Sequence, residues 1–131
     1  MALSSKQPRW DIYETVILLE GYLETLQGIQ SKSQIIKRIS ADLRRMAVNR
    51  GVEIDDVYRN ENGVSYQIQS MDSAFKGQKV YVPATKLFTD AVALYRTDNE
   101  GYQKILGEAK GMITVKKNSR EAFLAWAKSA F

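Results

Sequence analysis

The sequence predicts an all-α fold: a three-helix core of the helix-turn-helix or Myb type, followed by two or three further helices. Apolar residues recur every three or four positions along most of the 131-residue chain, which is the spacing of one helix face. Only two prolines occur, Pro8 and Pro83, and both stand where a helix can begin. Hydrophobic residues make up 44% of the chain, enough for one buried core.

The first two helices have clear apolar stripes and glycine stop signals. The first is predicted over residues 10–26, ending before Gly28, with a stripe of Ile12, Val16, Leu19, Leu23 and Leu26. The second is predicted over residues 33–49, ending before Gly51, with a stripe of Ile35, Ile36, Ile39, Leu43 and Met46.

A short third helix is predicted from Asn60 or Asn62, either of which can cap it, to about Met71. Its inward-facing residues are Val64, Ile68 and Met71. Residues 75–79 are expected to form an exposed loop, and residues 80–82 a short extended segment before Pro83.

A fourth helix is predicted over residues 84–95, and a fifth from the capping sequence at Thr97 to Gly111. Residues 114–117 are expected to be a polar link, after which Asn118 and Glu121 predict a last helix. We therefore expect a domain over residues 1–113. The helix in residues 114–131 either packs on it or begins a second domain.

Composition excludes several classes of chemistry. The chain has no Cys and no His, which rules out disulfide scaffolds, zinc fingers, thiolate nucleophiles and Ser-His-Asp triads. Glu108-Ala109-Lys110 matches a nuclease tripeptide, but it lies inside a predicted helix with no sheet around it. We expect a non-catalytic protein without a cofactor. The N-terminus has no apolar leader and no apolar run is long enough to span a membrane, so we expect a cytoplasmic protein.

Positive charge is concentrated in the second helix. The whole chain has 19 Lys and Arg against 15 Asp and Glu, a formal charge of +4. Residues 31–50 contain one acid, Asp42, and six cations: Lys32, Lys37, Arg38, Arg44, Arg45 and Arg50. These cations either meet phosphates or pair with the acids of the first helix, and both can hold because the first helix has fewer acids than there are cations.

The outer face of the third helix is polar and uncharged. It is expected to present Asn62, Ser65, Gln67 and Gln69. Asn and Gln pair with adenine edges and Ser contacts bases or phosphates, although a polar outer face is also what ordinary solvated helices have. Tyr66 is the aromatic residue expected to contact nucleic acid.

Three segments carry a family resemblance: Trp10, residues 36–44 and above all residues 58–72, which read Tyr-Arg-Asn-Glu-Asn-Gly-Val-Ser at their start. Together they resemble the DNA-binding module at the N-termini of bacterial McrA-like HNH endonucleases and related defence proteins. The third helix is also similar to the recognition helix of Myb-type domains. The chain departs from the family in having Gln67-Ile68 where Lys-Leu is usual, and it has no histidines for an HNH nuclease.

The resemblance implies a module that binds double-stranded DNA with the third helix in the major groove, in restriction-associated defence or on a mobile element. The expected base-reading and positioning residues are Arg59, Asn60, Asn62, Ser65, Tyr66, Gln67 and Gln69. The expected phosphate contacts are Lys37, Arg44, Arg45, Lys76 and Lys79, the last two in the loop after the third helix.

The alternative is a helical protein-interaction module: an adaptor, or a small inhibitor of a nucleic-acid enzyme encoded by a phage or mobile element. Its partner, or a second copy of the chain, would dock on Phe123, Trp126 and Phe131 of the last helix.

Overall fold

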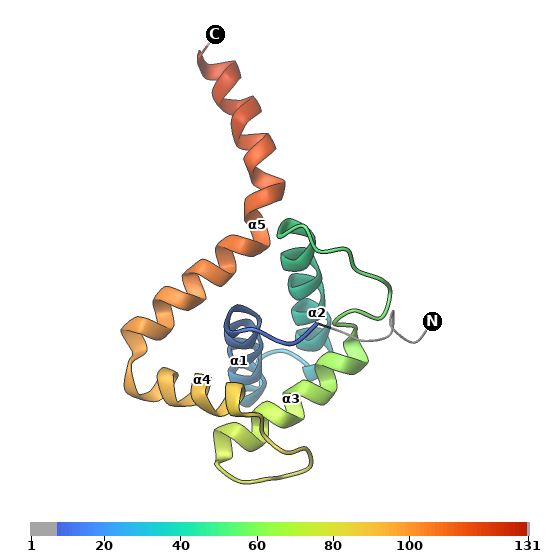
Figure 1. Ribbon diagram of the computed structural model, residues 1–131, viewed down its shortest axis with the longest axis vertical. Helices are drawn as coiled ribbons and strands as arrows, with labels where there is room; N and C mark the ends of the chain where they lie inside the picture. The colour runs from blue at the N-terminus through green and yellow to red at the C-terminus, as the bar shows by residue number, and fades with distance from the viewer. Residues whose placement is uncertain (1–7, 131) are drawn as a thin grey trace.

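The computed structural model describes residues 8–130, and the side chains of residues 8–114. Within that range the chain is all-helical and has no strand, which confirms the predicted class. Its helices are α1 (Ile12–Gln27), α2 (Lys32–Asn49), α3 (Glu61–Lys76), α4 (Lys86–Thr97) and α5 (Asn99–Ala130) (Figure 1). Residues 50–60 join α2 to α3, a longer connection than the three- or four-residue turn of a helix-turn-helix.

The first helix, α1, lies at the centre of the bundle and packs against each of the other four helices. A capping box starts it: the Glu14 amide donates to Asp11 Oδ1 at 2.9 Å, and the Asp11 amide donates to Glu14 Oε1 at 3.2 Å. The helix ends at Gly28, whose φ of 70° places it in the left-handed region. Six consecutive residues starting at Glu14 are buried, as expected for a helix surrounded by others.

The core is formed by the predicted stripes of α1 and α2 together with residues from every later helix. Its largest fully buried side chains include Leu18, Leu19, Ile35, Leu43, Met71, Phe88 and Tyr102. Gly21 allows α1 and α2 to approach closely, since a Cβ built on it would lie 2.8 Å from Ile39 Cγ1. The apolar spacing in the sequence therefore identified the buried face of α2. In α1 it was only partly correct, because Leu26 of the predicted stripe is 55% exposed and Leu18, outside that stripe, is fully buried.

Several helix ends differ from their predicted positions. The end of α3 is Lys76 instead of Met71, because Gly77 supplies the left-handed cap with a φ of 74°. The start of α4 follows Thr85, whose hydroxyl accepts from the Phe88 amide at 3.1 Å.

The start of α5 is capped by Asp98 and not by Thr97, which is the last residue of α4. The Asp98 carboxylate accepts from the Gly101 amide at 3.0 Å. The capping sequence was correctly located, but the capping side chain is one residue later than predicted.

The last predicted boundary is wrong, because α5 continues without a break through Gly111 and through residues 114–117. Helical glycine costs only about 1 kcal/mol relative to alanine, so one glycine does not end a helix unless it adopts the left-handed region. The side-chain amide of Asn49 donates to the carbonyls of Met112 and Ile113 at 2.9 and 2.7 Å. Beyond this contact α5 bends and projects from the bundle (Figure 1). Phe123, Trp126 and Phe131 lie outside the residues whose side chains are described, so docking on them stays a prediction.

Candidate nucleic-acid interface

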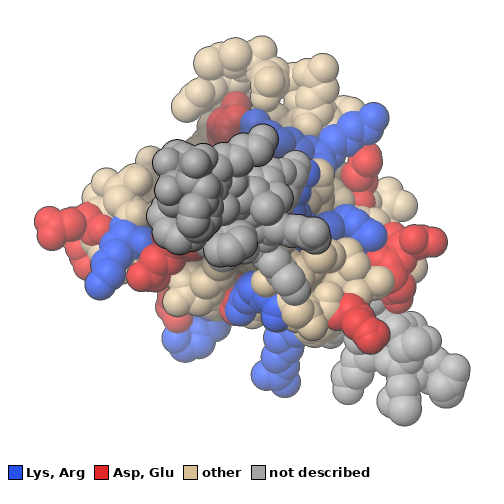
Figure 2. All heavy atoms as spheres, turned by 90° about the horizontal axis from the view of Figure 1, so that it is seen from above, with Lys and Arg blue, Asp and Glu red and all other residues tan. Residues whose placement is uncertain are grey.

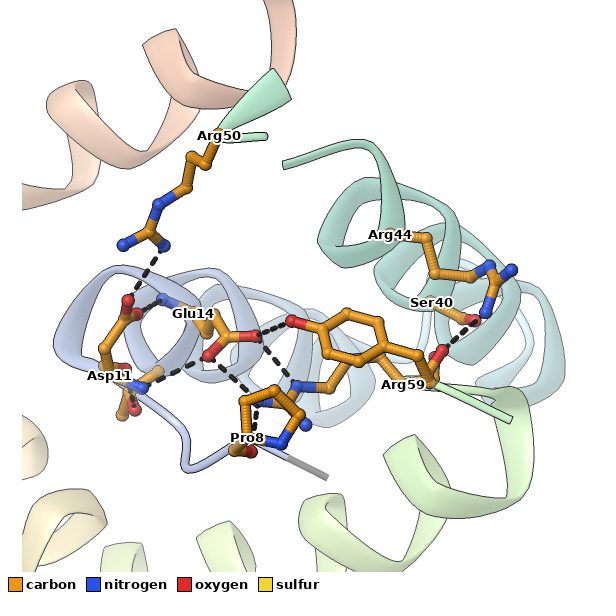
Figure 3. Close-up of polar contacts among 9 residues, drawn as sticks. Pro8, Asp11, Glu14, Ser40, Arg44, Arg50 and Arg59 are labelled. Atoms are coloured by element: carbon orange, nitrogen blue, oxygen red, sulfur yellow. Dashed lines mark hydrogen bonds and ion pairs between the residues drawn. The ribbon is translucent and has the colours of Figure 1, made fainter. Parts of the chain in front are cut away.

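The segment leading into α3 is fixed by a buried ion pair between Arg59 and Glu14, whose side chains are 4% and 5% exposed. Arg59 Nε donates to Glu14 Oε2 at 2.8 Å, and Nη2 donates to Glu14 Oε1 at 3.1 Å and to the Pro8 carbonyl at 2.9 Å (Figure 3). Its guanidinium carbon lies 4.8 Å from the Trp10 ring centroid and 4.5 Å from that of Tyr58. Arg59 therefore positions the start of α3 from inside the molecule, contrary to its predicted place at the DNA.

The residues around Arg59 hold the same segment. The Ser40 hydroxyl donates to the Arg59 carbonyl at 2.7 Å. Arg44 Nη1 donates to the carbonyls of Asp55 and Tyr58 at 3.0 and 2.6 Å. The Asp55 carboxylate accepts from the amide of Tyr58 at 2.8 Å and so caps the turn before Arg59. Arg44 is half-buried, so its charge stands at a fixed position beside α3.

Most of the motif at residues 59–65 is explained by these structural contacts. Asn60 caps α3, accepting from the Gly63 amide at 2.8 Å. A Cβ on Gly63 would lie 3.2 Å from Asn60 Oδ1, and Val64 is fully buried. Of the motif's uncharged polar side chains Asn62 is exposed, whereas Asn60 and Ser65 are half-buried, so most of the motif has a structural role in this chain.

The outward part of α3 is its first half, which we call the N-terminal face of α3: Asn62, Ser65, Tyr66 and Gln69. Asn62 and Tyr66 are exposed, and Ser65 and Gln69 are half-buried. Gln67 lies on a different side of α3, where it lines a hollow with Pro8, Trp10 and other residues.

The second half of α3 is covered on its outer side by the loop to α4. The Ser70 hydroxyl donates to the Pro83 carbonyl at 2.8 Å, and the Ser73 hydroxyl donates to the Val82 carbonyl at 2.7 Å. The surface of α3 available to a ligand is therefore shorter than the helix itself.

The predicted phosphate contacts do not all lie on one side. Lys37 is exposed and lines a hollow of about 350 Å³ with Arg44 and Asn60, between α2 and the start of α3. Two acids, Asp56 and Glu61, line the same hollow. Arg45 is exposed too, but at 100° per residue it stands about 80° around the α2 axis from Lys37, toward the side where Arg38 meets α1. The structure therefore brings Lys37 and Arg44 together beside α3 and leaves Arg45 apart.

Several cations are paired with acids, which was the predicted alternative to phosphate contacts. Arg38 contacts Glu24 at 2.7 Å, and Arg50 contacts Asp11 at 2.8 Å. Lys76 is the last residue of α3 and not a loop residue, and it pairs with Asp72 at 3.1 Å. Viewed from above in Figure 2, Lys and Arg side chains alternate with Asp and Glu instead of forming one patch.

Lys32, Lys37 and Lys79 make no ion pair with any described residue. Lys79 stands exposed in the loop after α3, as predicted. These three lysines leave positive charge on the side of the molecule that carries the N-terminal face of α3 and its loop.

A larger hollow, which we call the tyrosine hollow, was not predicted. It has a volume of about 540 Å³ and is lined by Tyr22, Thr25, Leu26, Lys32, Ile68, Gln69, Asp72 and Tyr81. The Tyr22 hydroxyl donates to Asp72 Oδ1 at 2.6 Å. Partial burial alone would raise the pKa of Asp72, but the hydrogen bonds from Tyr22 and Lys76 outweigh it and lower that pKa. No local pattern predicts this hollow, because its residues come from three helices and a loop.

No helix of the described chain is long and apolar enough to cross a membrane, and the described residues contain no group of three or more carboxylates placed to hold a metal ion. Comparison of the chain with protein-family models, curated proteins and solved structures finds no match.

Proposed function

We propose that this protein is a non-catalytic, double-stranded-DNA-binding module that contacts its ligand through the N-terminal face of α3. One observation carries the proposal. Residues 62–69 contain no acidic side chain and present Asn62, Ser65 and Gln69 beside an exposed Tyr66. Hydrogen-bonding side chains of this kind recognise base edges, whereas an ordinary solvated helix face usually contains charged residues of both signs.

The phosphates would be held by the cations that adjoin this face. Lys37 and Arg44 stand where α2 meets the start of α3, and Lys79 follows the end of α3. Arg44 is held by two backbone carbonyls, so little side-chain entropy is lost when it binds an anion. Such contacts add affinity for any sequence and weaken as salt rises.

The test is fluorescence anisotropy with a labelled random-sequence duplex at two salt concentrations. Lys37→Glu should weaken binding to every sequence and lower the slope of log affinity against log salt by about 1 or more. The matched control is Arg45→Glu, the same charge change about 80° around the α2 axis, which should have a clearly smaller effect. Asn62→Ala should instead change the preference among sequences.

Two results would contradict the proposal. Absence of duplex binding at the lower salt concentration would refute the function. Equal losses for Lys37→Glu and Arg45→Glu would show only a general attraction to net charge, and would refute the assignment of the α2–α3 side as the interface.

A further inference from the structure

We propose that the tyrosine hollow binds a single unpaired base of a nucleic-acid strand and favours bases that carry an exocyclic amino group. This inference rests on the function proposed above. The inference extends the proposed nucleic-acid contact from the N-terminal face of α3 to the adjacent tyrosine hollow, because Gln69 belongs to both.

The hollow offers the apolar surface that a base needs. Tyr81 and Leu26 are 78% and 55% exposed at its rim, while Ile68 is buried below. An aromatic ring that stays this exposed in the folded protein contributes little to the core. A base that stacks on it removes its apolar surface from water.

The polar groups of the hollow are fixed and complementary to an amino edge. Asp72 is oriented by the Tyr22 hydroxyl at 2.6 Å and by Lys76 at 3.1 Å. A carboxylate only accepts hydrogen bonds, so it suits the amino groups of cytosine and adenine better than the carbonyl edge of thymine. The Gln69 amide donates and accepts, and can serve the neighbouring position on the same base.

Charge around the hollow suits a strand that enters from solvent. Lys32 lines the hollow and Lys79 lies two residues before Tyr81 in the loop, and neither makes an ion pair with a described residue. The negative charge of Asp72 is offset by Lys76. Phosphates on either side of the bound base would therefore meet lysines and not an uncompensated acid.

The experiment compares the full chain's affinity for a paired duplex with its affinity for the same duplex carrying one extra, unpaired cytosine or thymine. The expected result is binding of the cytosine bulge about tenfold tighter than the paired duplex, with the thymine bulge in between. Tyr81→Ala should remove most of this preference and Tyr81→Phe should keep it, because stacking needs the ring and not the hydroxyl. Asp72→Asn should abolish the difference between cytosine and thymine, since an amide pairs with either edge.

The main variant of this test should fold like the unchanged protein. Tyr81 is too exposed for its loss to unfold the protein, and Val48→Ala, at an exposed apolar residue of α2 outside the hollow, serves as the control. Duplex binding without any preference for a bulge would overturn the base site and leave the proposed function standing. A preference that survives both Tyr81→Ala and Asp72→Asn would place the base elsewhere, and absence of binding to all three ligands would overturn both proposals.

Discussion

The ion pair between Glu14 and Arg59 shows how a single buried contact determines the geometry beside the candidate interface. Both side chains are almost fully excluded from water, where an unpaired charge is costly. Arg59 is satisfied by Glu14, by the Pro8 carbonyl and by two aromatic rings. Its φ of 46° lies in the left-handed region, a strain that these contacts maintain. The pair therefore connects the N-terminal segment, α1 and the start of α3.

Glu14→Gln should lower the free energy of unfolding by about 3 kcal/mol, because it leaves the Arg59 guanidinium buried without a counter-charge. Glutamine keeps one oxygen for the capping box, so the loss comes from the charge and from the second oxygen, which accepts from Arg59 Nε and from the Tyr58 hydroxyl. Urea unfolding measures the effect. The control is Glu24→Gln, which removes the charge from an exposed pair with Arg38 and should cost at most about 1 kcal/mol. Similar losses for the two variants would contradict the structural role given to Arg59.

At the residue scale, the sequence predicted the roles that depend on neighbouring positions in the chain. It missed the roles that depend on a partner far away in the sequence. Asn60 as a cap and Val64 as a core residue follow from helix rules, and the structure confirms both. The burial of Arg59 and Tyr58 depends on Glu14, 45 and 44 residues away, and no local pattern encodes that contact. The tyrosine hollow was missed for the same reason.

At the scale of the helix, the backbone conformation of a glycine decides whether the helix ends there. Gly28 and Gly77 end helices with φ of 70° and 74°, whereas Gly111 lies within α5. The sequence contains all three in similar surroundings, so it predicted a stop at Gly111 that does not occur. Gly111 differs from the other two through its tertiary contacts. The part of α5 before it packs on α1 and α2, and the side-chain amide of Asn49 donates to carbonyls in the turn that follows it.

Two helical glycines should respond to alanine with opposite signs. Gly21→Ala should destabilise the protein by about 1–3 kcal/mol, because the new methyl group overlaps Ile39 between α1 and α2. Gly107→Ala meets no neighbouring atom within 4 Å and should stabilise α5 by up to about 1 kcal/mol. Thermal and urea unfolding of both variants provide the measurement. Stabilisation by Gly21→Ala would show that α1 and α2 do not approach each other as closely as the structure has them.

At the scale of the whole molecule, three tyrosine–carboxylate hydrogen bonds among the described side chains connect α1 to other segments. Tyr22 donates to Asp72 of α3, Tyr58 of the connector donates to Glu14, and Tyr102 of α5 donates to Glu20, at 2.6, 3.3 and 2.8 Å. Burial raises the pKa of all three phenols above the ordinary value of 10.0, and the adjacent carboxylates raise it further. These three tyrosines therefore contribute to the response of the protein's stability to alkaline pH.

The sign of that response follows from linkage. Because the folded state holds these phenolic protons more tightly than the unfolded chain, their contribution to stability is complete below pH 10 and is lost as the pH rises above it. The urea midpoint should therefore be nearly constant between about pH 6 and pH 9 and fall above pH 10. Tyr102→Phe should lower stability at neutral pH by about 1 kcal/mol, through the lost hydrogen bond to Glu20. It should also make the alkaline decline shallower, since one titrating group is gone. An equally steep decline in Tyr102→Phe would show that folding does not raise the pKa of Tyr102, contrary to its burial against Glu20.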